Sequence, residues 1–418
     1  MQIELIIIAS EILNGKIQDL NTHWLSRFLF KQGFGLCHVT IIPDDESTMV
    51  ETFQKALERS QIIITSGGLG PTKDDLTKDM VGKLLGKELI ESAEALKITE
   101  KNYERFKRTY EKEKFHYHTI PEGTIPFNNP CGTAPGLATL FGDKCITCLP
   151  GVPKEFEEMF AEEIFPFLQK QYNLKPGFQS LVTVKTKLLP ESKIFSEICP
   201  TLWDDLSLLG SVSSLPHIMG VDIGVMISAK SELELDQKKS KALTLMQNPS
   251  LQNSIWNVGH ESLEEIIIKE AAAKGLTIGT VESCTGGLIA NRLTNVSGSS
   301  SVFLGSIISY ANSVKEELAH VPKATLKEFG AVSIETAKCL ADGGVKSLGA
   351  HIVVATTGIA GPTGGSKEKP VGTICIGLKS NDKAHAESYH FAGDRLKLKE
   401  RFSQMALYLL LDEIRGYR

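Results

Sequence analysis

The chain has 418 residues, of which 42% are hydrophobic and 23% charged, a composition typical of soluble globular proteins of two to three domains. It excludes a disordered or collagen-like chain, and no apolar run approaches the roughly 20 residues that span a bilayer. Lys and Arg total 45 against 50 Asp and Glu, and the net charge of −5 argues against bulk nucleic-acid binding. Eight cysteines are too few for a disulfide scaffold. We therefore expect a cytoplasmic protein with free thiols and no membrane partner.

Strand and helix signals alternate from the N-terminus, which predicts parallel βαβ units in one sheet. Strands are expected at 3–10, 37–44, 61–68 and 144–149, and helices at 21–33, 46–60, 76–86 and from Pro153. The polar segment 91–118 is typical of an exposed helix.

A small α+β insert is expected next, with strands at 179–189 and 220–230 and helices at 191–203 and 232–247. The α/β pattern then returns, with helices at 262–275 and 333–349 and strands at 276–282, 351–361 and 371–380. The chain is thus expected to consist of two α/β domains, 1–172 and 258–418, joined by a small α+β domain, 175–255.

The first candidate site follows the strand that ends at Ser66. Gly67, Gly68 and Gly70 allow backbone N–H groups to crowd around an anion at the carboxyl end of a parallel strand. The acids that follow, Asp74 and Asp75, can either cap the next helix or hold a divalent cation bound to phosphates. The combination favours a phosphate site over a simple turn.

The second candidate site is Glu-Ser-Cys-Thr-Gly-Gly at 282–287, between a strand and a helix. Such a turn exposes a nucleophile and aims helix N–H groups at the same point, where they can form an oxyanion hole. Ser283 and Cys284 are both candidate nucleophiles, and intrinsic reactivity alone favours the thiol. The alternative is that Ser283 or Thr285 only caps the helix.

A serine nucleophile needs a base, and Lys315 follows a strand in Tyr-Ala-Asn-Ser-Val-Lys at 310–315. A lysine desolvated in a cleft can take the serine proton, although most helix lysines are exposed. A second glycine loop at 357–365 suits ribose or phosphate, and Arg395 offers a guanidinium for phosphate.

The N-terminal motifs resemble the molybdopterin-binding, or molybdenum-cofactor-biosynthesis-like, domain family. The resemblance rests on four segments. They are the glycine loop with Thr-x-Asp-Asp, residues 10–21, Asn-Pro-x-Gly-Thr-Ala-Pro-Gly at 129–136, and Leu-Pro-Gly-Val-Pro-Lys-Glu at 149–155. Ala9 stands where the family usually has glycine, and its methyl group narrows the approach of a ligand.

The C-terminal motifs resemble the C-terminal domain of the CinA, or competence/damage-inducible protein A, family. Five segments carry this resemblance in order: 282–287, 310–315, 329–333, 357–373 and 391–395. Together the two resemblances cover essentially the whole chain, and the insert 175–255 is similar to the family's KH-like linker. It contains no G-x-x-G loop flanked by basic residues, so no RNA partner is expected.

The resemblance implies a pyridine-nucleotide salvage enzyme with two substrates. The C-terminal domain is expected to hydrolyse nicotinamide mononucleotide (NMN) to nicotinate mononucleotide and ammonia without a cofactor. The N-terminal domain is expected to cleave ADP-ribose to AMP and ribose 5-phosphate with Mg²⁺ or Mn²⁺. A homodimer is also implied. The alternatives are an amidase whose N-terminal half only binds a pterin or nucleotide, or a competence accessory protein without catalysis.

The implied residues fall into four sets. The catalytic residues are Ser283, Lys315, Tyr310, Thr285 and, in the N-terminal site, Asp75. The other amidase contacts are Cys284, Gly286, Gly287, Asn312, Gly358, Gly361, Gly364, Gly365 and Arg395. The ADP-ribose contacts are Glu11, Asn14, Asp19, Asn21, Ser66, Gly67, Gly68, Gly70, Thr72, Lys73, Asn129, Gly132, Thr133, Gly136, Pro150, Gly151 and Lys154. The metal ligands are Asp74, Asp75 and Glu11.

Overall fold

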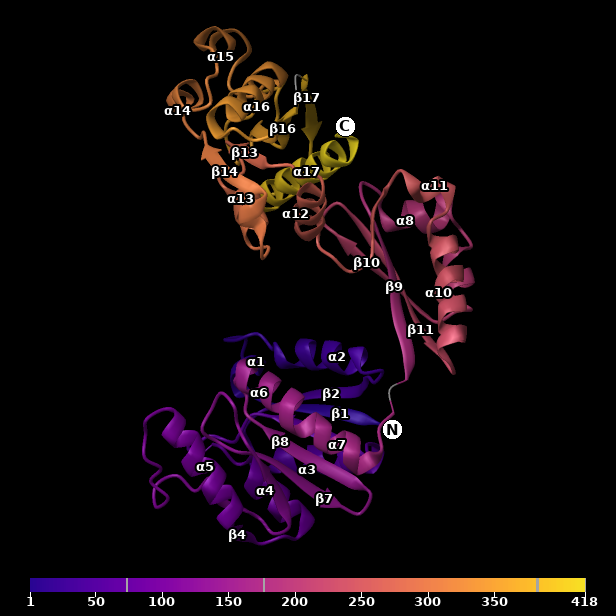
Figure 1. Ribbon diagram of the computed structural model, residues 1–418, viewed down its shortest axis with the longest axis vertical. Helices are drawn as coiled ribbons and strands as arrows, with labels where there is room; N and C mark the ends of the chain where they lie inside the picture. The colour runs from indigo at the N-terminus through magenta and orange to yellow at the C-terminus, as the bar shows by residue number, and fades with distance from the viewer. Residues whose placement is uncertain (73, 176, 381–382, 418) are drawn as a thin grey trace. The chain divides into compact units, whose positions relative to one another are not determined.

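The computed structural model describes residues 1–72, 74–175, 177–380 and 383–417, and the chain forms two compact units (Figure 1). The first unit contains residues 1–179 and 229–232, and the second contains 180–228 and the chain from 233 onwards. The insert expected at 175–255 therefore groups mainly with the C-terminal part, and the division into three domains stays a prediction. No helix in the described ranges is long and apolar enough to cross a bilayer.

The first unit is built on a six-stranded sheet in the order β2-β1-β3-β8-β7-β6. Its strands are β1 (Ile3–Ile8), β2 (Leu36–Ile42), β3 (Ile62–Ser66), β6 (Thr124–Phe127), β7 (Gly136–Phe141) and β8 (Lys144–Leu149). The pairs β1–β2, β1–β3 and β3–β8 are parallel, whereas β6–β7 and β7–β8 are antiparallel. A short ribbon pairs β4 (Leu89–Glu91) with β5 (Thr119–Pro121). The predicted α/β class is confirmed.

Helices cover both faces of this sheet because the buried strands are apolar on both sides. On β1, Leu5 and Ile7 pack in one core with α2 (Asn21–Lys31), α6 (Pro153–Met159) and α7 (Phe165–Tyr172). Ile6 and Ile8 pack in the other with α3 (Glu46–Arg59), α4 (Thr77–Leu85) and α5 (Ala93–Arg105). A short helix, α1 (Ser10–Leu13), follows β1. Both cores anchor the strand ends that carry the first candidate site.

The polar segment 91–118 differs from the prediction of one exposed helix. The helix α5 ends at Arg105, and Tyr103 on its inner face packs against Tyr110, Phe115 and Tyr117. His118 is buried, and its Nδ1 lies 2.9 Å from the Tyr110 hydroxyl. The interspersed aromatic residues extend the core that α5 shares with α3 and α4, which the charge pattern concealed.

The insert has a four-stranded sheet in the order β10-β11-β9-β12, inside the second unit. Its strands are β9 (Phe178–Thr186), β10 (Ser211–His217), β11 (Gly220–Ala229) and β12 (Ile255–Val258). Its helices are α8 (Glu191–Lys193), α9 (Leu202–Ser207), α10 (Glu232–Met246) and α11 (Pro249–Gln252). The expected strands β9 and β11 are present, whereas the serine-rich β10 and the short β12 carried no clear strand signal. The KH-like assignment stays a prediction.

The rest of the second unit is built on a five-stranded sheet in the order β14-β13-β15-β16-β17. Its strands are β13 (Ile278–Glu282), β14 (Phe303–Ile308), β15 (Ile352–Gly358), β16 (Thr373–Ser380) and β17 (Lys383–His390). The three strands β14, β13 and β15 are parallel, and β16 and β17 are antiparallel to their neighbours. The edge strand β17 is polar and largely exposed, so its sequence gave no strand prediction.

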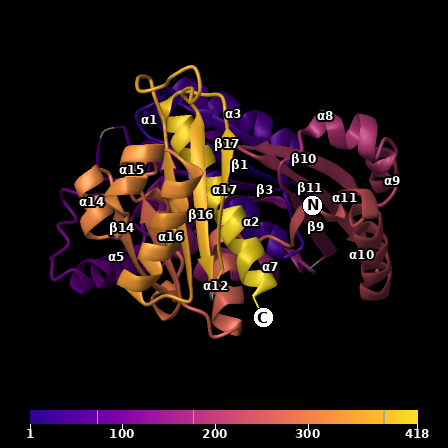
Figure 2. The same ribbon diagram turned by 90° about the horizontal axis from the view of Figure 1, so that it is seen from above.

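Helices again cover both faces of this sheet, as Figures 1 and 2 show for α16 and α17 beside β16. The larger core contains α12 (Leu263–Ala273), α13 (Leu288–Thr294) and α17 (Arg395–Gly416). The smaller core contains α16 (Ile334–Leu348). Two short helices, α14 (Asn312–Glu317) and α15 (Lys323–Phe329), follow β14. The carboxyl ends of β13, β14 and β15 meet at one edge, where the second candidate site lies.

Candidate functional site

The C-terminal site is a cavity of about 210 Å³ at the carboxyl ends of β13 and β15. Ser283 begins the turn between β13 and α13, and its amide donates to the Thr356 carbonyl at 3.0 Å on the neighbouring strand. The side chain is 8% exposed and lines the cavity. The turn therefore presents the hydroxyl to a ligand while the backbone stays fixed in the sheet.

Lys315 approaches Ser283 from α14 and is 1% exposed, which contradicts the interpretation of an exposed helix lysine. Its Nζ lies 3.1 Å from Ser283 Oγ, 2.6 Å from the Ser309 carbonyl oxygen and 3.2 Å from the Tyr310 carbonyl oxygen. A neutral amine has two hydrogens, one for each carbonyl, and a lone pair that is then left for the Ser283 hydroxyl. Burial lowers the pKa of Lys315, which favours this neutral form.

Cys284 lies next to Ser283 in the chain and lines the same cavity, but its thiol is held in the protonated form. It is 6% exposed, and burial raises its pKa to about 12. A thiol nucleophile acts as the thiolate, so this environment makes Cys284 unreactive near neutral pH. The environments of the two side chains therefore favour Ser283 over Cys284 as the candidate nucleophile.

The prediction that amides at the N-terminus of α13 form an oxyanion hole differs from the structure, because three of them bind Glu282 instead. The amides of Gly287, Ile289 and Ala290 donate to the buried carboxylate of Glu282 at 2.9, 3.1 and 2.8 Å. These donors are therefore unavailable to a substrate. The predicted catalytic residue Thr285 is also buried outside the cavity, and its hydroxyl lies 2.9 Å from that of Thr356.

The rim of the cavity joins three predicted residues. Arg395 donates to the Gly361 carbonyl at 2.7 Å and to the Tyr310 hydroxyl at 3.1 Å. The Tyr310 side chain is 63% exposed, so only its backbone carbonyl orients Lys315. The exposed ring and the guanidinium are placed to contact a substrate that enters the cavity.

The cavity gathers most, but not all, of the predicted amidase residues. Those that line it are Ser283, Cys284, Tyr310, Asn312, Lys315, Gly358 and Arg395. Those that lie outside its lining are Thr285, Gly286, Gly287, Gly361, Gly364 and Gly365. Lining residues absent from the predicted set are Ala331, Val332, Thr357 and Ala360. All four lie in segments that carry the resemblance, Ala331 and Val332 in 329–333 and Thr357 and Ala360 in 357–373. A strand-end argument could have included Thr357, because it belongs to β15.

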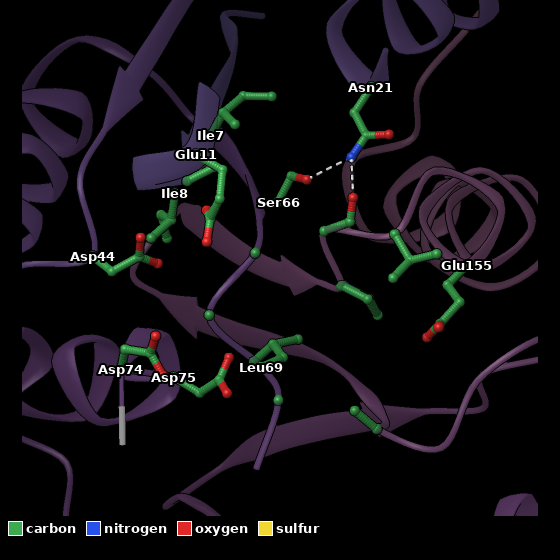
Figure 3. Close-up of a pocket in the computed structure, with 18 of the residues that line it drawn as sticks. Ile7, Ile8, Glu11, Asn21, Asp44, Ser66, Leu69, Asp74, Asp75 and Glu155 are labelled. Carbon is green, nitrogen blue, oxygen red and sulfur yellow. Dashed lines mark hydrogen bonds between the residues drawn. The ribbon is translucent and has the colours of Figure 1, made fainter. Parts of the chain in front are cut away.

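The N-terminal site is a larger cavity of about 570 Å³ at the carboxyl ends of β1 and β3 (Figure 3). Gly67 and Gly68 line it with φ angles of 109° and 68°. A Cβ at Gly68 would lie 2.1 Å from Thr77 Oγ1, and the Thr77 hydroxyl donates to the Gly67 carbonyl at 2.9 Å. The loop is thus fixed in a conformation that only glycine adopts without strain.

Acidic side chains line this cavity from several strand ends. Glu11, Asp44, Asp74 and Asp75 face the same space in Figure 3. Asp75 Oδ2 accepts from the Thr72 amide at 2.8 Å and from the Thr72 hydroxyl, so this carboxylate closes its own turn. It is not the N-cap of α4, which is Leu76. Among the described residues, no three His, Cys, Asp or Glu side chains gather closely enough to hold a metal ion.

Asn21 lines this cavity and carries a side-chain oxygen that has no hydrogen-bond partner in the structure. Its Nδ2 donates to Ser66 Oγ at 2.8 Å and to the Gly151 carbonyl at 3.0 Å (Figure 3). The side chain is 5% exposed, and its Oδ1 is buried with no hydrogen-bond partner in the structure. A buried amide oxygen without a donor is costly, and a ligand hydroxyl would satisfy it.

The structure places the predicted ADP-ribose residues in three groups. The cavity is lined by Glu11, Asn21, Ser66, Gly67, Gly68, Gly70, Thr72, Asp74, Asp75, Thr133, Pro150 and Gly151. Outside its lining are Asn14, Asp19, Asn129, Gly132, Gly136 and Lys154. Lys73 lies outside the described residues.

Several residues outside the lining support the site instead. The Asp19 carboxylate accepts from the Thr22 amide at 3.1 Å, and Asn129 accepts from the amides of Cys131 and Gly132. Asp44 and Tyr117 line the cavity although neither was predicted. Asp44 follows the parallel strand β2, so its position at a strand end could have identified it.

These features define a class of protein with two separate α/β sites, one with a glycine-rich loop and acids, and one with a serine–lysine pair. Residues 4–170 match the family described as "Probable molybdopterin binding domain", and residues 260–414 match the CinA C-terminal domain.

Relatives match over nearly the whole length. A CinA-like protein of Kosmotoga olearia is 36% identical over 413 residues, 97% of each chain, and one of Chlorobium luteolum is 36% identical over 422 residues, 99% of this chain and 97% of that one. The crystal structure of a competence/damage inducible protein of Agrobacterium tumefaciens is 36% identical and covers 37% of this chain and 98% of its own, with a TM-score of 0.35. The chain belongs to the CinA family.

Proposed function

We propose that the C-terminal site deamidates NMN to nicotinate mononucleotide and ammonia. The observation that carries this proposal is the buried contact of 3.1 Å between Lys315 Nζ and Ser283 Oγ. A serine beside a desolvated lysine is a nucleophile–base pair for acyl transfer. The exposed Tyr310 ring can stack on a pyridinium ring, and Arg395 can bind a phosphate.

In the acylation step, Ser283 Oγ attacks the carboxamide carbon and its proton moves to Lys315 Nζ. The C–N bond of the tetrahedral intermediate then breaks as Lys315 returns that proton to the leaving nitrogen, which departs as ammonia. Because Glu282 occupies amides of α13, the oxyanion is left to an amide of the turn. That of Cys284, which lines the cavity, has no backbone acceptor among the described residues.

In the deacylation step, water attacks the Ser283 ester, and Lys315 accepts the water proton. The ester C–O bond breaks, Ser283 Oγ regains a proton from Lys315, and the carboxylic acid product leaves and loses its proton to the solvent. The carbonyls of Ser309 and Tyr310 hold Lys315 Nζ throughout, so that the same nitrogen serves as base and acid. No cofactor is needed for these steps.

For the N-terminal site, we propose hydrolysis of ADP-ribose to AMP and ribose 5-phosphate with Mg²⁺ or Mn²⁺. The glycine loop, the unpartnered Asn21 oxygen and the acids Asp74, Asp75 and Glu11 support this proposal. Magnesium is commonly held by one or two carboxylates together with substrate phosphates, so a three-ligand protein cluster is not required. When bound there, the ion would supply charge stabilisation to the pyrophosphate.

A second candidate for this half is a pterin- or nucleotide-binding module without catalysis, alongside an active amidase. It is favoured by the absence of a three-ligand cluster in the described residues and by the engagement of Asp75 with Thr72. Ala9, which lines the cavity, narrows the ligand approach in either case. Both candidates place a nucleotide-like ligand in the same cavity.

Two assays test these proposals on the full-length protein. Ammonia release from NMN should be seen with the wild-type protein and lost in Ser283→Ala. AMP release from ADP-ribose should depend on added Mg²⁺ or Mn²⁺, and its absence with every metal, together with measurable ADP-ribose binding, would favour the binding module. Sedimentation would test the homodimer, which we also propose from the family.

A further inference from the structure

We infer that Glu282 is a positioning residue that sets the geometry between the Ser283 nucleophile and the Lys315 base. This inference rests on the proposed amidase function, and it concerns a residue that touches neither the cavity nor the reacting atoms. Glu282 is the last residue of β13 and is fully buried, with 0% exposure. It directly precedes the nucleophile in the chain.

The side chain of Glu282 fixes the turn that carries Ser283. Its Oε2 accepts from the amides of Gly287 and Ile289, and its Oε1 accepts from that of Ala290. The bonds bridge the end of β13 and the beginning of α13, with the nucleophile between them. Gly286 and Gly287, with φ angles of 63° and 92°, let the chain turn back tightly enough for this contact.

The main chain of Glu282 fixes the base. Its carbonyl accepts from the Ser309 amide at 2.8 Å, and the Ser309 carbonyl in turn accepts from Lys315 Nζ at 2.6 Å. One residue thus connects to the nucleophile through its side chain and to the base through its backbone. A shift of the turn changes the distance between Ser283 and Lys315 directly.

The carboxylate also determines which amides are left for the substrate. It consumes the donors at the start of α13, and the amides that remain without a backbone acceptor lie at 284–286. Glu282 therefore holds the nucleophile and also occupies the helix amides, so that they are not free to bind an anion.

The test replaces Glu282 by Gln, which keeps the size but turns one acceptor into an NH₂ group facing an N–H donor. The matched control is Glu264→Gln, because Glu264 also holds α13, through Arg292 Nε at 2.5 Å, but does not line the cavity. We expect E282Q to lower kcat for NMN at least tenfold with KM within about threefold. E264Q should lower Tm without lowering kcat. Equal losses of Tm and kcat in both variants would show a structural role only and overturn the inference.

A second readout separates this inference from the proposed function. Phenylmethanesulfonyl fluoride reacts with an activated serine to form the sulfonate ester and release fluoride, whatever the natural substrate is. Peptide mass spectrometry should show rapid labelling of Ser283 in the wild type and in E264Q, and labelling at least tenfold slower in E282Q. If the wild type is labelled faster than E282Q but does not turn over NMN, the proposed substrate is wrong and the role of Glu282 stands. Equal labelling rates in the wild type and E282Q would instead reject the positioning role of Glu282.

Discussion

The two cavities differ in how much of their chemistry is already assembled. In the C-terminal cavity, Lys315 is buried, is held by two carbonyls and contacts Ser283 at 3.1 Å. In the N-terminal cavity, the acids are spread over several strand ends, and one of them, Asp75, is engaged by Thr72. The serine–lysine contact of the smaller cavity is thus already formed, whereas the acids of the larger cavity stay apart.

The two proposed reactions account for this difference. A serine nucleophile needs a base within hydrogen-bond reach, and burial lowers the pKa of Lys315, which favours the neutral form that can act as that base. A pyrophosphate site gathers negative charge, and carboxylates that converge without a cation repel one another. Acids dispersed around a rigid glycine loop therefore agree with the pyrophosphate site that we propose.

The largest expected effect is that of Ser283→Ala on NMN deamidation. Loss of the nucleophile should lower kcat by roughly 10⁴-fold or more, as in other hydrolases that lose a nucleophilic serine. Cys284→Ala should stay within about tenfold of the wild type, because the Cys284 thiol has a pKa of about 12. Ammonia release measures both variants, and an inactive Cys284→Ala beside an active Ser283→Ala would reject the assignment.

The next effect concerns Lys315→Met, which keeps the length but removes the base. We expect kcat to fall about 10²–10⁴-fold, with a smaller change in KM, because the proton transfer occurs only in the transition state. In the wild type, kcat/KM should rise with pH through the folded pKa of Lys315. A variant with normal kcat would make Lys315 a structural residue.

We expect Lys315→Met also to be more stable than the wild type, by an amount that depends on pH. Burial lowers the pKa of Lys315 in the folded protein below its unfolded value of about 10.4. As the pH falls below that value, the unfolded chain gains a proton that the folded protein does not, so the free energy of unfolding decreases until the pH reaches the folded pKa. Lys315→Met should therefore raise Tm relative to the wild type more at pH 6 than at pH 10. Thermal unfolding at both pH values measures this, and a pH-independent difference would contradict a neutral buried lysine.

For the N-terminal cavity, Asp75→Asn separates a catalytic role from a turn role. Asn can still accept from Thr72, so Tm should change little, whereas loss of a metal-binding charge should lower ADP-ribose hydrolysis about 10²-fold. NMN deamidation should be unchanged. Unaltered hydrolysis of ADP-ribose in this variant would leave Asp75 with the turn role alone.

The smallest effect is expected for Asn21→Ala, which tests the unpartnered Oδ1. Loss of one buried hydrogen bond to the ligand costs about 1–3 kcal/mol, so the Kd for ADP-ribose should rise roughly tenfold or more by calorimetry. Thr22→Ala is the matched control, because Thr22 neighbours Asn21 on α2 but does not line the cavity. Equal affinities of Asn21→Ala and the wild type would contradict a ligand contact.

Sequence reasoning predicted the two α/β sheets and placed the loops after Ser66 and Glu282 at strand ends. With the family resemblance, it also named most of the lining of the C-terminal cavity and half of that of the N-terminal cavity. It missed β10 and β17, whose polar side chains hide the strand period, and the aromatic core around Tyr103. It also assigned the α13 amides to the substrate. The competing acceptor, Glu282, lies inside the recognised motif, but only the fold shows that its side chain bends back onto the helix.

The most direct test of the serine–lysine assignment is a rapid quench of the wild-type protein with NMN, followed by peptide mass spectrometry. We predict an ester on Ser283 that adds to its peptide the mass of NMN minus that of ammonia, and no such adduct in Ser283→Ala. An acyl adduct on Cys284 would contradict the account, as would continued ammonia release by the Ser283→Ala protein.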